Sequence, residues 1–132
     1  MIVLDASAAL ELLLGLPLSP AVQRRLEEAD WHVCAPQLLV VEVLQVLRRR
    51  VAAGLTSSDA ADEARSLLGD LGVRYFEHEL LAERIWALRD NLTAYDAAYV
   101  ALAEAVGAPL LTTDARLAHA PGNDARIVLL ER

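Results

Sequence analysis

Five short apolar segments alternate with longer segments of helical character, and this alternation most constrains how the chain can fold. The expected strands are Ile2–Leu4, His32–Ala35, Val73–Phe76, Pro109–Thr113 and Ile127–Leu130. Strands that are apolar along their whole length are typical of a parallel sheet buried on both faces, with helices as the crossovers. We therefore predict an α/β fold with three layers, α/β/α, around a central, mainly parallel five-stranded sheet.

The segments between these strands are predicted to be helical. The expected helices are Ala6–Leu14, Ala21–Ala29, Gln37–Ala53, Ala60–Leu71, Glu79–Arg89 and Thr93–Val106. Pro36 suits the first position of the third helix, and Gly107 suits the residue that follows the last one. The 132 residues contain no repeat and no linker, and 55% of them are hydrophobic. This length and composition predict one packed domain over residues 1–132.

The apolar runs are too short to cross a bilayer, which takes roughly 20 residues. The first residues place an acid, Asp5, after only three apolar residues, which does not resemble a signal peptide. The single cysteine, Cys34, cannot form an internal disulfide, and its apolar surroundings predict an ordinary core residue. We therefore expect a cytoplasmic protein that does not associate with a membrane.

Four acids from distant parts of the sequence are expected at one edge of the sheet. Asp5 and Asp114 directly follow the first and fourth strands, and ligands of such sheets bind at the carboxyl ends of the strands. Asp96 lies in the first turn of the helix that leads into the fourth strand, so it starts at the same edge. Glu42 lies about two turns, roughly 9 Å, along the helix that leaves the second strand. Crowded carboxylates repel one another, and Mg²⁺ or Mn²⁺ would offset that repulsion.

Each acid taken alone also has a purely structural interpretation. Asp5 and Asp114 could cap the helices that follow them. Asp96 stands three residues after Thr93, which is the spacing of a capping box. Glu42 could belong to a solvated helix face. These interpretations do not predict that all four acids converge on one edge, whereas a metal site does.

The local sequences around the four acids resemble the motifs of PIN domains, in order and across the whole chain. The matching segments are Val3-Leu4-Asp5-Ala6-Ser7-Ala8, Pro36-Gln37-Leu38 with Glu42-Val43 and Leu47-Arg48, Tyr95–Ala103, and Leu111–Asp114 with Arg116-Leu117-Ala118. The chain is especially similar to the VapC-type toxins of bacterial toxin–antitoxin pairs. Each motif alone is weak, but four in register are specific.

This resemblance implies a metal-dependent endoribonuclease that hydrolyses RNA phosphodiester bonds with Mg²⁺ or Mn²⁺. The matching catalytic and metal-binding positions are Asp5, Glu42, Asp96 and Asp114. Ser7 and Thr112 match polar positions beside the acids, where they could bond a ligating carboxylate or a metal-bound water. They could equally be cap or turn hydroxyls.

The formal net charge of −7 does not favour tight RNA binding by the free chain. A bound cation or a basic partner would reconcile this charge with an RNA substrate. The VapC resemblance implies such a partner, a small antitoxin that offers Arg or Lys to the acids. The helices Gln37–Ala53 and Ala60–Leu71 carry more apolar residues than one sheet face can cover, so we also expect a homodimer, as in the family.

Two other functions fit parts of the sequence. A binding module could keep the PIN fold without catalysis, although no motif acid is missing here. An aspartyl-phosphate phosphotransferase also carries an Asp after its first strand. Those of the haloacid-dehalogenase type need a second Asp two residues later, where this chain has Ser7.

Overall fold

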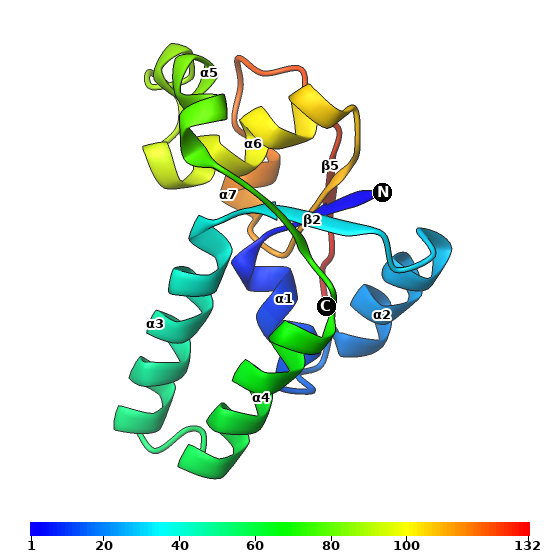
Figure 1. Cartoon of the computed structure of the whole chain (residues 1–132), viewed down its shortest axis with the longest axis vertical. Coiled ribbons are helices and arrows are strands. Elements are labelled where there is room, and N and C mark those ends of the chain that lie inside the picture. Colours follow the sequence, from blue (N-terminus) through cyan, green and yellow to red (C-terminus); the bar gives the residue numbers. More distant parts are fainter.

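The computed structural model describes all residues from 1 to 132 and contains one five-stranded sheet (Figure 1). The strands are β1 (Ile2–Leu4), β2 (Val33–Pro36), β3 (Arg74–Phe76), β4 (Leu110–Thr112) and β5 (Ile127–Leu129). Their order in the sheet is β3-β2-β1-β4-β5, and every neighbouring pair is parallel. The predicted α/β fold is confirmed, and the sheet is parallel throughout rather than mainly so.

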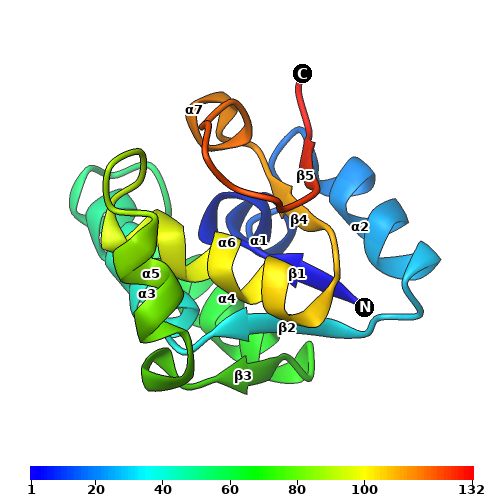
Figure 2. The same ribbon diagram turned by 90° about the horizontal axis from the view of Figure 1, so that it is seen from above.

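Helices cover both faces of this sheet (Figures 1 and 2). They are α1 (Ala6–Leu13), α2 (Ser19–Glu28), α3 (Leu38–Ala52), α4 (Ser58–Asp70), the 3-10 turn η1 (His78–Leu81), α5 (Ala82–Ala87), α6 (Ala94–Val106) and α7 (Ala115–Ala118). Helices α1 to α4 lie on one side of the strands, and α5 and α6 lie on the other. None of these helices has both the length and the apolar character needed to cross a membrane.

The central strands and α6 form the middle of the core. All three residues of β1 are buried, as are those of β4. In α6 the run Ala97–Ala103 is buried without a break, because small alanine side chains allow the helix to lie close to β1 and β2. Thr93 caps the start of this helix, and Gly107 ends it with a left-handed backbone at φ 65°. These two ends fix where Asp96 stands.

Two local expectations were wrong. Pro36 does not open a helix: it is the last residue of β2 and pairs with Phe76 of β3, and α3 begins at Leu38. The segment expected as one helix over Glu79–Arg89 is instead η1 followed by the short α5. The 3-10 turn brings the His78 ring to the start of α3, where Nε2 accepts the backbone N–H of Leu38 at 2.9 Å. A helix after Asp114, which the capping interpretation implied, is present as the four-residue α7.

Candidate active site

The parallel sheet directs the ends of β1 and β4 towards the same edge. Asp5 follows β1 directly and is the N-cap of α1, and Asp114 is the N-cap of α7 after β4. Helix α6 begins near this edge and carries Asp96 in its first turn. Glu42 projects from α3, which starts two residues after β2.

Asp5 is the buried member of this group, with only 5% of its surface exposed. Its Oδ1 accepts the backbone N–H of Ala8 at 2.9 Å and the hydroxyl of Ser7 at 2.7 Å. Its Oδ2 accepts the hydroxyl of Thr112 at 2.5 Å. Burial raises the pKa of Asp5 to about 6, because desolvation outweighs these three hydrogen bonds and Glu42 adds a smaller repulsion. This carboxylate is thus held rigidly, and its charge is costly without a nearby cation.

The hydroxyls of Ser7 and Thr112 each link Asp5 to the end of β4, the strand that pairs with β1. The Ser7 hydroxyl also accepts the backbone N–H of Thr113 at 3.0 Å. The hydroxyl of Thr112, which is fully buried, accepts the backbone N–H of Asp114 at 3.0 Å. The two hydroxyls therefore tie the end of β1 to the loop that carries Asp114.

Glu42 is half-buried and has one hydrogen-bond partner. The phenol of Tyr99, which lies on α6, donates to Oε1 of Glu42 at 2.6 Å. Burial raises the pKa of Glu42, the Tyr99 hydrogen bond lowers it, and the charge of Asp96 raises it. The pKa of Tyr99 is raised by its own burial and by the Glu42 carboxylate, so Tyr99 remains a donor.

Asp96 and Asp114 form the more exposed part of the edge. The backbone N–H of Asp96 donates to Thr93 Oγ1 at 3.2 Å, which is half of the expected capping box. The Asp96 carboxylate does not complete the box. Its Oδ2 accepts from Arg116 Nη2 at 2.7 Å, and the same nitrogen lies 3.1 Å from Asp114 Oδ2. One guanidinium nitrogen thus bridges the two carboxylates.

No three His, Cys, Asp or Glu side chains stand close enough together to hold a metal ion. The carboxylates nevertheless influence one another, because Glu42 raises the pKa of Asp5 and Asp96 raises that of Glu42. Like charges that repel keep apart, and a cation draws them together. The donor set consists of carboxylate oxygens, the ligands that hard cations such as Mg²⁺ and Mn²⁺ prefer, and a cationic nitrogen already lies between two of them.

Two residues at this edge were not singled out from the sequence. Tyr99 lies three residues after Asp96, so both lie on neighbouring parts of one helix face. Arg116 lies two residues after Asp114, inside the fourth matching segment. The helical spacing could have indicated Tyr99. The contact of Arg116 with Asp96 could not be read from spacing, because it joins residues 20 apart across two helices.

A comparison with protein families gives the class of this fold and site. The PIN domain model matches residues 2–123, so the chain belongs to the PIN-domain family. The acids described above lie within this match.

Relatives that align with most of this chain show to which group within the PIN-domain family it is similar. The chain is 42% identical over 130 residues to "Ribonuclease VapC12" of Mycobacterium tuberculosis, covering 98% of this chain and 99% of the relative. It is 43% identical to "Ribonuclease VapC1" of the same species, covering 97% and 96%. It is 44% identical to "VapC ribonuclease Mb0985" of Mycobacterium bovis, covering 89% and 88%. Within the PIN-domain family the chain therefore groups with the VapC proteins.

A solved structure supports the fold independently. The crystal structure of PAE2754 from Pyrobaculum aerophilum superposes with a TM-score of 0.64 and covers 88% of this chain and 81% of its own. The two sequences are 21% identical, so the likeness concerns the fold alone.

Proposed function

We propose that residues 1–132 act as one nuclease domain, a metal-dependent endoribonuclease toxin that hydrolyses RNA phosphodiester bonds. The VapC relatives carry the name ribonuclease, which supports the reaction. The observation that carries the proposal is the arrangement of carboxylates at one sheet edge, with Asp5 buried and fixed and with Asp96 and Asp114 sharing one cationic nitrogen. Capping α1 requires only the bond from Ala8, and burial of the Asp5 carboxylate among three uncharged partners supports a cation-binding role in addition.

Asp5, Glu42, Asp96 and Asp114 would hold Mg²⁺ or Mn²⁺ in this proposal. Such an ion lowers the pKa of a water and stabilises the charge that develops on the phosphate. Thr112 and Ser7 fix the orientation of Asp5, and Tyr99 fixes that of Glu42. Ligands that neighbouring hydrogen bonds hold rigidly impose their geometry on a bound ion.

The partner we propose besides RNA is a small antitoxin that neutralises the enzyme in the cytoplasm. The chain has a net charge of −7 and acids along one edge, so a segment carrying Arg or Lys complements it. Arg116 already shows how a guanidinium is received there, because it contacts two of the acids. Purification of the protein from its host should recover it with a short basic polypeptide.

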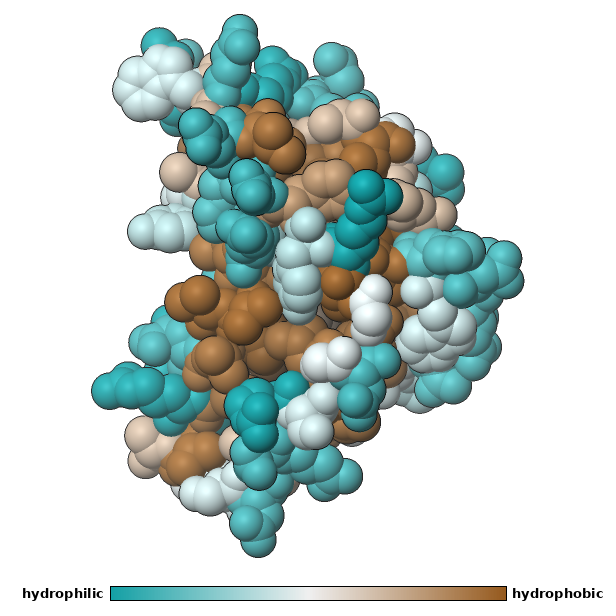
Figure 3. Space-filling model, viewed as in Figure 1, coloured by the Kyte–Doolittle hydropathy of each residue, from teal (hydrophilic) through white to brown (hydrophobic).

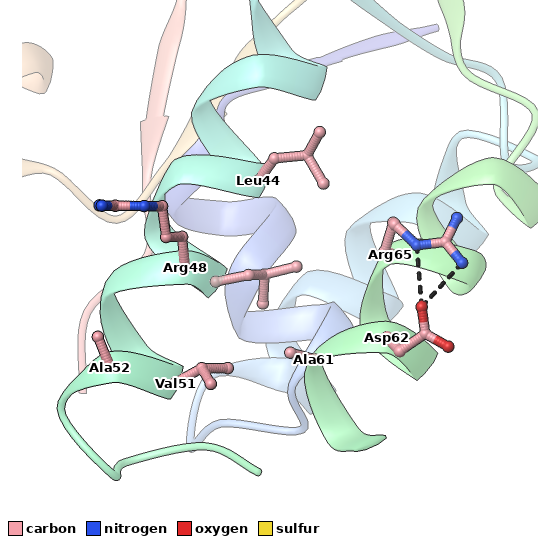
Figure 4. Close-up of a pocket in the computed structure, with 8 residues that line it drawn as sticks. Leu44, Arg48, Val51, Ala52, Ala61, Asp62 and Arg65 are labelled. Carbon is pink, nitrogen blue, oxygen red and sulfur yellow. Dashed lines mark hydrogen bonds and ion pairs between the residues drawn. The ribbon is translucent and has the colours of Figure 1, made fainter. Parts of the chain in front are cut away.

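A homodimer is the second assembly we propose, and apolar residues of α3 and α4 support it. Val41, Leu44 and Leu67 are exposed at 66%, 40% and 41%. Figure 3 shows an apolar patch over this part of the molecule. A cavity of about 430 Å³ lies between the two helices, with Leu44, Val51 and Ala61 directed into it (Figure 4). Light scattering at micromolar concentration should give the mass of a dimer, and Leu44→Glu should give that of a monomer.

Cleavage of single-stranded RNA with and without EDTA tests the proposed reaction. Mg²⁺ or Mn²⁺ should support cleavage, EDTA should abolish it, and Asp5→Asn should remove it in either buffer. Asp70→Asn is the matched control, because it makes the same chemical change at an exposed carboxylate at the end of α4. Cleavage that survives exhaustive chelation would overturn the proposal.

A further inference from the structure

Arg116 is the one cationic side chain that contacts the acids of the site. Its Nη2 lies 2.7 Å from Asp96 Oδ2 and 3.1 Å from Asp114 Oδ2. The side chain of Arg116 is 64% exposed, while those of Asp96 and Asp114 are 21% and 36% exposed. A positive group therefore sits between two carboxylates, where an ion held by both would also have to sit.

The contacts of Asp114 show that this guanidinium is not required to build α7. Oδ1 of Asp114 caps the helix by accepting the backbone N–H groups of Arg116 and Leu117, at 2.9 and 3.4 Å. Only Oδ2 meets the Arg116 side chain. The guanidinium can therefore leave without breaking the cap.

A second arginine of the chain shows the contrasting arrangement. Arg84 donates two hydrogen bonds to Glu104, at 2.7 and 2.9 Å, and the backbone N–H of Asp124 donates to the same carboxylate at 2.8 Å. That pair joins α5, α6 and the segment before β5, so it is a structural link. Arg116 instead uses one nitrogen for both acids and remains open to solvent.

We propose that Arg116 is a displaceable internal counter-ion, which holds Asp96 and Asp114 together in the metal-free protein and has to move away when a divalent cation binds. This rests on the proposed function, because it needs the acids to bind an ion. Arg116 competes with that ion for the same oxygens, so it lowers the affinity of the site. In exchange it limits the repulsion between the carboxylates while no ion is present.

Two measurements on Arg116→Met, which keeps an unbranched side chain and removes the charge, test this proposal. Calorimetric titration should show Mn²⁺ binding on the order of five-fold more tightly than in the parent, because two exposed charge contacts no longer compete. The metal-free variant should melt about 2–4 °C lower than the parent. At saturating Mn²⁺ this deficit should disappear, since Arg116 is then displaced in the parent too.

Two further variants test whether the loss of any exposed arginine, or a change of shape at position 116, would give the same result. Arg65→Met removes an exposed arginine that pairs with Asp62 at 2.9 Å on α4, and it should leave the affinity for Mn²⁺ unchanged. Arg116→Lys keeps the charge and should return both the affinity and the metal-free melting temperature towards the parent values.

The outcomes separate this inference from the function on which it rests. A parent protein that binds no Mn²⁺ would overturn both. A parent that binds Mn²⁺ while Arg116→Met binds it equally or more weakly would overturn the counter-ion role alone, and so would a melting deficit that persists at saturating Mn²⁺.

Discussion

The two halves of the acid edge are built in different ways. Asp5 is almost completely buried and receives its hydrogen bonds from the backbone N–H of Ala8 and from two hydroxyls. Asp96 and Asp114 are partly exposed and share the guanidinium of Arg116. The buried half thus has donors but no positive charge, whereas the exposed half has a positive charge that can move. A backbone N–H and two hydroxyls fix Asp5, whereas the exposed side chain of Arg116 holds Asp96 and Asp114 together.

This difference indicates which of the two halves a bound cation would stabilise more. In the buried half the charge of Asp5 is unfavourable, as its raised pKa shows. In the exposed half Arg116 already offsets the charge. In the proposed site, a divalent cation would therefore stabilise the buried half most and would replace an existing interaction in the exposed half.

Among the changes that follow, Asp96→Asn is expected to have the largest effect on activity. If Asp96 is a metal ligand, cleavage of single-stranded RNA should fall by at least about 100-fold, the scale of losing one electrostatic stabiliser. The metal-free fold should be hardly affected, because the cap by Thr93 uses the backbone N–H of residue 96 and is kept. The lost contact with Arg116 is exposed, and removing one carboxylate also relieves repulsion within the group. An active variant with an unchanged Mn²⁺-induced melting shift would remove Asp96 from the site.

Stability should depend on pH through Asp5. Its pKa is raised from 3.8 to about 6 in the folded protein, so the folded form binds the proton more tightly than the unfolded one. The stabilisation is therefore complete below about pH 4 and is lost as the pH rises through about 6, by about 3 kcal/mol. Urea unfolding in metal-free buffer across this range measures it. Asp5→Asn should lack this loss, and an equal pH dependence in that variant would contradict the assignment.

Thr112→Val is expected to cost about 1–3 kcal/mol of unfolding free energy at neutral pH, because it removes a buried hydroxyl from Asp5 while keeping the shape. The pKa of Asp5 should rise further, since that hydrogen bond lowers it. Thr113→Val is the matched control, because the neighbouring hydroxyl takes part in no hydrogen bond of the site. Equal losses in the two variants would show that Thr112 acts by packing alone.

Tyr99→Phe should have the smallest effect, about 0.5–1.5 kcal/mol, the value of one hydrogen bond. Removal of the phenol raises the pKa of Glu42, so the acidic limb of the pH–rate profile should move to higher pH. The folded state should be retained, because the ring that packs in α6 remains. A profile that does not move would mean that Glu42 does not titrate in the catalysed reaction.

The sequence was sufficient for the fold because the apolar strands and the helical segments alternate with little ambiguity. It also placed Asp5 and Asp114, since each follows a strand directly. It failed at residues 78–89, where tertiary contacts of His78 with the start of α3 accompany a 3-10 turn in place of a continuous helix. It assigned no role to Arg116 or Tyr99, because their contacts depend on how α6 and α7 are oriented on the sheet.

The four-acid site is tested most directly by calorimetric titration of Mn²⁺, followed by an RNA cleavage assay. Both are done on the parent and on four variants: Asp5→Asn, Glu42→Gln, Asp96→Asn and Asp114→Asn. We predict that the parent binds Mn²⁺ and that each variant loses at least about tenfold in affinity, about 1.4 kcal/mol, together with most of its cleavage. A parent that cleaves RNA without binding Mn²⁺, or a variant that keeps both properties, would contradict it.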